Sequence, residues 1–205
     1  MDAKSHWEEV YRAKAATAVS WYQRQARLSL DLIREVAPDL AVPLIDVGGG
    51  ASTLVDGLLD SGYTDLSVLD LAESALDIAR ARLGERARRV RWLAEDVLNI
   101  QLPVRHFGLW HDRAVFHFLT DTADRARYVE QARRAIRPGG HIIVASFAPD
   151  GPTRCSGLDV VRYSPGSMHA EFGGEFELLD SRREEHQTPG GAIQSFVYCL
   201  CRVEE

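Results

Sequence analysis

Short apolar segments alternate with amphipathic segments through the middle of this 205-residue chain. Five segments have the length and composition of buried strands: 43–47, 65–71, 89–96, 106–112 and 141–147. Helical patterns separate most of them; after 65–71, for example, Leu76, Ala79 and Leu83 fall on one helix face. This alternation predicts an α/β fold in which a doubly wound sheet is covered by helices on both faces.

The flanks of this alternating region have a different pattern. Two helices are expected before it, over 5–16 and 27–36. After it come a polar loop at 148–166 and a short helix near 165–172, and then two alternating segments around a Thr-Pro-Gly-Gly turn, typical of an antiparallel hairpin. The sequence therefore predicts a single domain over 1–205. Its parts are N-terminal helices (1–37), an α/β core (42–147), and a loop with a C-terminal hairpin (148–205).

Charge and composition exclude several functions. Lys and Arg total 24 against 30 acidic residues, a net charge of −6, which disfavours binding to nucleic acid or anionic membranes. All but two of the basic residues are arginines, and six of them cluster over 80–91, where we expect them to lie away from the strand ends. No apolar run approaches the length of a membrane span, and the three cysteines form no framework, so we expect a cytoplasmic protein with no metal site and no membrane contact.

Four of the expected strands end in a carboxylate: Asp46, Asp70, Asp96 and Asp112. In an open α/β sheet, ligands bind beyond the carboxyl ends of the strands. These repeated carboxylates therefore indicate a binding site there.

Three glycines, Gly48, Gly49 and Gly50, follow the first strand. Glycines without Cβ atoms allow a ligand to lie against the main chain, although a tight turn without a ligand is the alternative. Thr53 stands where the dinucleotide pattern requires glycine, and Asp46 would repel a pyrophosphate but attract an ammonium or a sulfonium. The pattern disfavours a nicotinamide-dependent oxidoreductase.

The next two strand ends suit a nucleoside. Asp70 can accept from both hydroxyls of a ribose, or cap the following helix, and the two roles are compatible. Asp96 can accept from an exocyclic amine, the Val97 backbone can serve a ring nitrogen, and Leu71 offers an apolar edge to a purine. Together these residues predict a nucleoside with a cationic, amine-containing tail.

At this point the chain resembles the class I S-adenosylmethionine-dependent methyltransferases. The likeness lies in LIDVGGGAS (44–52), VLDLAESAL (68–76), LAEDV (93–97), WHDRAVFHFL (110–119) and RAIRPGGHIIVASF (134–147). The resemblance implies S-adenosylmethionine as cofactor. It also implies a Rossmann-like seven-stranded sheet of order 3-2-1-4-5-7-6, with strand seven antiparallel.

The N-terminal aromatics resemble the branch of this family that includes some eukaryotic protein-lysine methyltransferases. That resemblance implies that Trp7, Tyr11 and Trp21 cover the cofactor, as a lid formed by the N-terminal helices. Aromatic faces attract a sulfonium. The alternative, in which Trp7 and Tyr11 only dock an amphipathic helix, is equally open.

Candidate catalytic residues follow the fourth strand: His111, Asp112 and Arg113. His111 or Asp112 is expected beside the methionine part of the cofactor. Arg113 is expected either to hold an anionic group of the substrate or to pair with Asp112. His117 is a further substrate candidate, although packing among its aromatic neighbours is favoured.

The loop after the fifth strand is expected to shape the acceptor pocket. Its candidates for substrate binding are Arg154, Cys155, Arg162 and Tyr163, with Cys155 more typical of an inert buried thiol. His186 is expected to approach from the hairpin.

These patterns predict an enzyme that methylates a small-molecule acceptor, a thiol, hydroxyl or carboxylate, by in-line displacement. A protein (lysine) methyltransferase and a non-catalytic module that binds S-adenosylmethionine are the two alternatives. The sequence leaves the acceptor atom (S, O or N) and the oligomeric state open.

Overall fold

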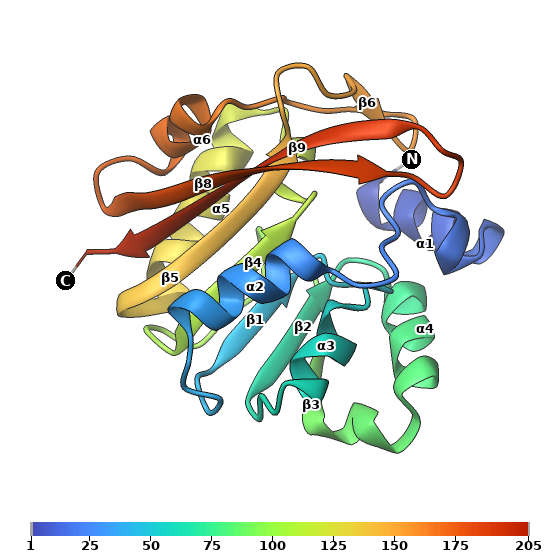
Figure 1. The fold of residues 1–205 in the computed structure, drawn as a ribbon, viewed down its shortest axis with the longest axis horizontal. Helices are drawn as coiled ribbons and strands as arrows, with labels where there is room; N and C mark the ends of the chain where they lie inside the picture. Colours follow the sequence, from blue (N-terminus) through green and yellow to red (C-terminus); the bar gives the residue numbers. More distant parts are fainter. Residues whose placement is uncertain (1, 205) are drawn as a thin grey trace.

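The computed structural model describes residues 2–204, which form a seven-stranded sheet between two layers of helices (Figure 1). The strands of this sheet are β1 (Leu44–Val47), β2 (Leu66–Asp70), β3 (Val90–Ala94), β4 (Phe107–Arg113), β5 (Ile136–Phe147), β8 (Phe176–Gln187) and β9 (Ile193–Val203). Their order is β3-β2-β1-β4-β5-β9-β8; β1 to β5 are parallel, and β9 is antiparallel to both β5 and β8. With the strands of this sheet numbered one to seven along the chain, the order is 3-2-1-4-5-7-6, so the predicted fold is confirmed.

The α-helices are α1 (Ala3–Ala13), α2 (Arg27–Val36), α3 (Leu54–Asp60), α4 (Glu73–Leu83), α5 (Thr122–Ala135) and α6 (Pro165–Phe172). Short 3-10 turns are η1 (Ala16–Ala18), η2 (Gly84–Arg89) and η3 (Phe116–Phe118), and the loop after β5 contains a small hairpin of β6 (Arg154–Cys155) and β7 (Leu158–Asp159). Helices α2, α3 and α4 share one apolar core with one face of the sheet, whereas α5 and α6 share a second core with the other face. No helix in residues 2–204 is both long and apolar enough to traverse a bilayer.

Strand β5 begins at Ile136, five residues before the expected start at 141. Ile136 pairs with Phe107, and the register between β4 and β5 then shifts before Leu109 pairs with His141. Pro138, Gly139 and Gly140 lie in the shifted stretch, because proline cannot donate to a central ladder. The strand signal in the sequence starts only where the apolar run resumes.

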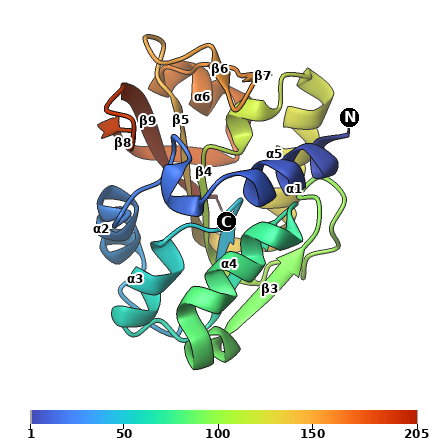
Figure 2. The same ribbon diagram turned by 90° about the vertical axis from the view of Figure 1, so that its right-hand side faces the viewer.

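The carboxyl ends of β1, β2 and β4 meet at one edge of the sheet. Helix α1 packs against α4 at this edge, and residues 14–26 connect α1 to α2 across it (Figure 2). Helix α2 is fixed by a buried face of Ala26, Leu30 and Ile33, at the spacing that an amphipathic helix requires. The N-terminal segment therefore lies over the strand ends that the sequence marks as a site.

Candidate functional site

Two cavities at this edge are lined by residues from the strand ends, and the larger of these two has a volume of about 400 Å³. Residues from the ends of three strands line it together: Val47, Gly48, Leu69, Asp70, Leu71, Arg113 and Ala114, with Asp96 and Val97 from the turn after β3. The residues expected to bind a nucleoside thus lie in one cavity, whose size suits a small-molecule ligand.

Asp70 lies in the wall of this cavity. One of its carboxylate oxygens accepts a backbone hydrogen bond, and the other points toward the glycine loop. Its Oδ1 accepts from the Ala72 N–H at 2.8 Å, and a Cβ built on Gly50 would lie 2.7 Å from its Oδ2. Burial raises the pKa of Asp70 to about 7, despite the hydrogen bond from Ala72, and the nearby carboxylate of Asp46 raises it further. A ligand hydroxyl that donates to Asp70 would hold it in its ionised form.

Asp96 closes the turn after β3. Its Oδ1 accepts from the Leu98 N–H at 2.9 Å and its Oδ2 from the Asn99 side chain at 2.7 Å. These bonds fix the carboxylate at the cavity wall.

Aromatic side chains from the N-terminal segment and from η3 cover the larger cavity. Trp7 contacts Trp21 and Phe118 edge to face, with ring centroids 5.7 and 5.1 Å apart, and Tyr11 lies 6.2 Å from Trp21. All four rings line the cavity while α1 packs on α4. Trp7 and Tyr11 therefore line the cavity on a helix that is docked on α4.

A second, smaller cavity of about 50 Å³ adjoins the first. Its wall includes Ser29, Asp46, Gly49 and His111, and four residues line both cavities: Tyr11, Trp21, Gly48 and Arg113. The two cavities are thus parts of one site.

His111 joins β1 to α2 in the wall of the smaller cavity. Its Nδ1 lies 2.7 Å from Asp46 Oδ1, and its Nε2 lies 2.9 Å from Ser29 Oγ. The contact follows from the sheet register, which pairs Asp46 with His111 on adjacent parallel strands. Because a carboxylate only accepts, Nδ1 carries the hydrogen; in the neutral imidazole Nε2 then accepts from Ser29. The second oxygen of Asp46 is buried and has no hydrogen-bond partner within residues 2–204.

Arg113 is held at the junction of the cavities by the C-terminal hairpin. Its Nε donates to Tyr198 Oη at 2.9 Å and its Nη2 to Glu184 Oε2 at 3.1 Å, while the guanidinium stacks on Phe196 at 4.2 Å. Glu184 also accepts from Gln23 at 2.9 Å, which ties the hairpin to the N-terminal segment. Arg113 therefore pairs with Glu184, and not with Asp112 as one sequence alternative proposed.

None of the three glycines after β1 has room for a side chain, and Gly48 and Gly50 also have positive φ. Gly48 has φ +67°, and a Cβ there would lie 1.9 Å from Val115 Cγ2; at Gly49, a Cβ would lie 2.5 Å from Asp46 Oδ2. A side chain at Gly49 would occupy the space beside the free oxygen of Asp46. The loop is thus shaped to bring backbone against a ligand.

Comparisons with known proteins agree with this site. Residues 44–140 match the model of a methyltransferase domain. The eEF1A lysine and N-terminal methyltransferase of Mus musculus is 26% identical over 149 residues, covering 70% of this chain and 21% of that protein. The match to the methyltransferase domain covers just under half of this chain. The chain spans only about a fifth of the length of that curated relative.

Solved structures share the whole fold at low sequence identity. The N-methyltransferase NodS from Bradyrhizobium japonicum WM9, in complex with S-adenosylhomocysteine, superposes with a TM-score of 0.73 at 16% identity and full coverage of both chains. A structure concerned with the conversion of a disulfide bond into a thioacetal group during echinomycin biosynthesis has a TM-score of 0.77 at 15% identity, covering 99% of this chain and 93% of that one. Both structures share the fold of this chain.

The residues in the two cavities fit S-adenosylmethionine, the cofactor that the sequence resemblance implies. The smaller cavity has a buried carboxylate oxygen without a partner in residues 2–204, which suits an ammonium, and the larger one has Asp70, which suits a ribose. The only arginine or lysine that lines either cavity is Arg113, already paired with Glu184, so the site favours a cationic ligand over a phosphate. The described residues contain no group of three or more His, Cys, Asp or Glu side chains placed to hold a metal ion.

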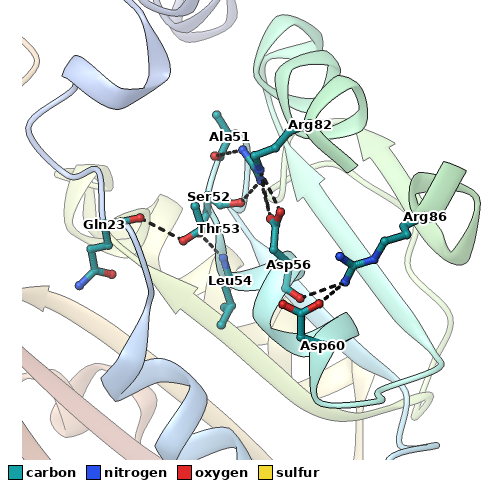
Figure 3. Close-up of polar contacts among 9 residues, drawn as sticks. All are labelled: Gln23, Ala51, Ser52, Thr53, Leu54, Asp56, Asp60, Arg82 and Arg86. Atoms are coloured by element: carbon teal, nitrogen blue, oxygen red, sulfur yellow. Dashed lines mark hydrogen bonds and ion pairs between the residues drawn. The ribbon is translucent and has the colours of Figure 1, made fainter. Parts of the chain in front are cut away.

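Arg82 corrects the expectation that the arginines over 80–91 lie away from the site. It donates to the carbonyls of Ala51 (2.8 Å) and Ser52 (2.6 Å), directly after the glycines, and pairs with Asp56 in α3 at 2.7 Å (Figure 3). On the other side of the loop, Thr53 donates to the carbonyl of Gln23 at 3.0 Å. Helix α4 and the N-terminal segment thus hold the glycine loop between them.

Replacing Arg82 by alanine is expected to weaken S-adenosylmethionine binding about fivefold, because the loop carbonyls lose a charged donor. Arg86→Ala is the matched control, since Arg86 pairs with Asp60 and contacts α3 without reaching the glycine loop (Figure 3). Isothermal titration of both variants measures the effect. Equal losses in the two variants would show that the contacts to the loop carbonyls do not matter for binding.

Asp112 lies on the opposite face of β4 from His111 and Arg113 and lines neither cavity. It is fully buried, and it accepts from the N–H groups of Val115 (2.9 Å) and Phe116 (3.1 Å) and from Tyr128 Oη (2.5 Å). Burial raises its pKa to about 6, although these hydrogen bonds lower it. The structure thus places Asp112 in the core and not in the wall of either cavity, where a catalytic residue beside the methionine part of the cofactor was expected.

His117 is also buried and lines neither cavity. Its ring packs against Phe118 and Phe147, with centroids 4.4 and 4.7 Å away, and burial lowers its pKa to about 3. The packing interpretation therefore fits the structure better than substrate contact.

The loop after β5 supplies two cavity residues, Cys155 and Leu158, and burial raises the pKa of Cys155 to about 11. Arg154 pairs with Asp159, and Arg162 donates to the carbonyls of Pro149 and Gly151, so both hold the loop itself. Tyr163 is buried against Phe116. His186 lies 2.7 Å from the Ser20 carbonyl, away from the cavities, and fastens the N-terminal segment.

Three functional residues were not found from the sequence. Ser29 is the polar member of the buried face of α2, a signal visible in the spacing of Ala26, Ser29 and Ile33. Glu184 and Tyr198 reach Arg113 from the hairpin, 71 and 85 residues away along the chain. No local pattern in the sequence predicts contacts at that separation.

Proposed function

We propose that this chain transfers the methyl group of S-adenosylmethionine to a small-molecule acceptor, a thiol, hydroxyl or carboxylate, by in-line displacement. The observation that carries the proposal is the joining of two cavities of different chemistry at Tyr11, Trp21, Gly48 and Arg113. One suits a nucleoside and the other an amino acid, so the sulfonium between these two parts belongs at the shared residues. When bound, S-adenosylmethionine supplies a methyl group that a nucleophile can displace from sulfur.

Each part of the cofactor has residues suited to hold it. Asp70 is assigned to the ribose hydroxyls, and Leu71, Asp96 and Val97 to the base. Asp46 is assigned to the ammonium group in the smaller cavity. Trp7, Tyr11 and Trp21 are assigned as its aromatic cover, because their rings exclude water and attract a sulfonium.

Arg113 is assigned to orient the acceptor. Its Nε, one Nη1 hydrogen and one Nη2 hydrogen are used within the protein, which leaves two of its five hydrogens for an anionic group. Tyr11 and Cys155 also line the larger cavity, and burial raises the pKa of both, so at neutral pH neither acts as a base. This chemistry favours an acceptor that arrives ionised, a thiolate or a carboxylate.

A protein acceptor is the second candidate, because the mouse relative is named as a lysine and N-terminal methyltransferase. The larger cavity, about 400 Å³ in volume, favours the small molecule, since the nucleoside of the cofactor and the acceptor must share it.

The test is to incubate the protein with S-adenosylmethionine and a panel of small thiols, carboxylates and alcohols, and to measure S-adenosylhomocysteine. Formation above background with a panel member supports the proposal. Transfer of a labelled methyl group into protein of a cell extract instead would support the protein acceptor. Tight cofactor binding with no product in either assay would support the non-catalytic binding module.

A further inference from the structure

Ser29, His111 and Asp46 form a continuous hydrogen-bonded chain that the proposed function does not use as a unit. Their exposed fractions are 1%, 2% and 3%, so each polar atom must be paired within the protein or with a ligand. Two links of the chain are made, at 2.9 and 2.7 Å, while Asp46 Oδ2 has no partner in the described residues. The chain therefore ends in an acceptor at the wall of the smaller cavity.

We propose that Ser29 and His111 are positioning residues that fix the Asp46 carboxylate, so that its free oxygen receives the ammonium group of the cofactor. Ser29 donates to Nε2, which fixes the imidazole tautomer, and Nδ1–H then holds Asp46 Oδ1. With one oxygen held, the other stays beside Gly49, where the absence of a side chain leaves it open.

The charge balance of the smaller cavity supports an ammonium at this place. Arg113, the only arginine or lysine in its wall, already pairs with Glu184. Asp46 thus keeps an anionic oxygen that a cation can neutralise. This inference rests on the proposed function only through the identity of the cofactor.

The same three residue types form the serine hydrolase triad, so nucleophilic catalysis is the competing role. Here the serine lies on the buried face of α2 with an exposed fraction of 1%, whereas a nucleophilic serine must be reached by its substrate. Positioning is therefore the role that the enclosure favours. Modification of Ser29 by a fluorophosphonate would overturn it in favour of a nucleophile.

The closing experiment compares two ligands that differ in the amino-acid part. S-adenosylhomocysteine carries the ammonium and carboxylate, whereas 5′-methylthioadenosine has the same nucleoside and thioether without them. Dissociation constants are measured by calorimetry for the wild type and for Ser29→Ala, His111→Phe and His111→Asn. Ser67→Ala, which removes a hydroxyl from an equally buried serine in β2, is the matched control.

His111→Phe is expected to weaken S-adenosylhomocysteine about tenfold and Ser29→Ala about threefold, with 5′-methylthioadenosine unchanged within about twofold. His111→Asn is expected to retain most of the affinity, because its amide can still donate to Asp46. Equal losses of affinity for both ligands would show that Ser29 and His111 serve only packing, and would overturn the inference. Unchanged binding in both Ser29→Ala and His111→Phe would also overturn it. If His111→Phe fails to fold, Ser29→Ala alone decides between these results. Because the readout is binding, absence of methyl transfer would count only against the proposed function.

Discussion

Asp70→Ala is expected to raise the dissociation constant for S-adenosylmethionine about a hundredfold. A carboxylate that accepts from two ribose hydroxyls makes two charge-assisted hydrogen bonds, and losing both costs about 3 kcal/mol. Isothermal titration measures the change. S-adenosylhomocysteine and 5′-methylthioadenosine should weaken in parallel, because both contain the ribose, whereas the Ser29 and His111 variants should separate them.

The pH dependence of binding gives a second measure of the same residue. Burial raises the pKa of Asp70 to about 7, so lowering the pH through 7 protonates the carboxylate and removes its charge and part of its acceptor capacity. We expect wild-type affinity to be about tenfold weaker at pH 6 than at pH 8, and we expect Asp70→Asn to lack this dependence. Unchanged affinity in Asp70→Ala would reject the assignment of Asp70 to the ribose. A wild-type dissociation constant that does not change with pH would show that Asp70 does not titrate between pH 6 and pH 8.

The raised pKa of Asp70 also predicts how the stability of the unliganded protein changes with pH. Because the folded pKa lies above the unfolded value of 3.8, the contribution of Asp70 to stability is present below pH 4 and is lost as the pH rises through 7. The unliganded Asp70→Asn variant should therefore gain thermal stability relative to wild type at pH 8. Calorimetric melting at pH 5 and pH 8 separates this effect from binding.

Strand ends could be located from the sequence because they coincide with changes from apolar runs to glycines and carboxylates. Asp46, Asp70 and Asp96 all line the cavities, as this logic predicts. The face to which a side chain points on β4 could not be predicted. That strand is buried on both faces, with Leu109 in one core and Trp110 in the other, so its pattern does not alternate.

Because the pattern of β4 does not alternate, the sequence does not show which of the neighbouring candidates on β4 line a cavity and which lie in the core. His111 and Arg113 lie on the face of α2 and α3, where the smaller cavity opens, while Asp112 points to α5. The contacts of the residues in the loop after β5 could not be predicted for a different reason. Arg154 and Arg162 satisfy carbonyls and a carboxylate within their own loop, and sequence spacing gives no direction for such contacts.

Asp112→Ala is expected to destabilise the folded protein by about 3–5 kcal/mol, the largest stability effect we expect from a single substitution near the site. Two backbone N–H groups and the Tyr128 hydroxyl would lose their acceptor in a fully buried position. For a chain of this length the melting temperature should fall by about 10 °C. Thermal and denaturant unfolding, both without ligand, measure the change.

Asp112→Asn distinguishes this core role from catalysis, because it keeps one side-chain oxygen as an acceptor while removing the charge. We expect a loss of about 1–2 kcal/mol in stability and little change in methyl transfer by the folded fraction. Burial raises the pKa of Asp112 to about 6, so the wild type loses stability from this group as the pH rises through 6. The stability deficit of Asp112→Asn relative to wild type should therefore shrink from pH 5 to pH 8.

Tyr128→Phe removes the hydroxyl that donates to Asp112. In the double variant the two losses of stability should not add, because both substitutions break one shared hydrogen bond. A folded Asp112→Asn protein of wild-type stability that had lost methyl transfer would instead return Asp112 to the catalytic residues.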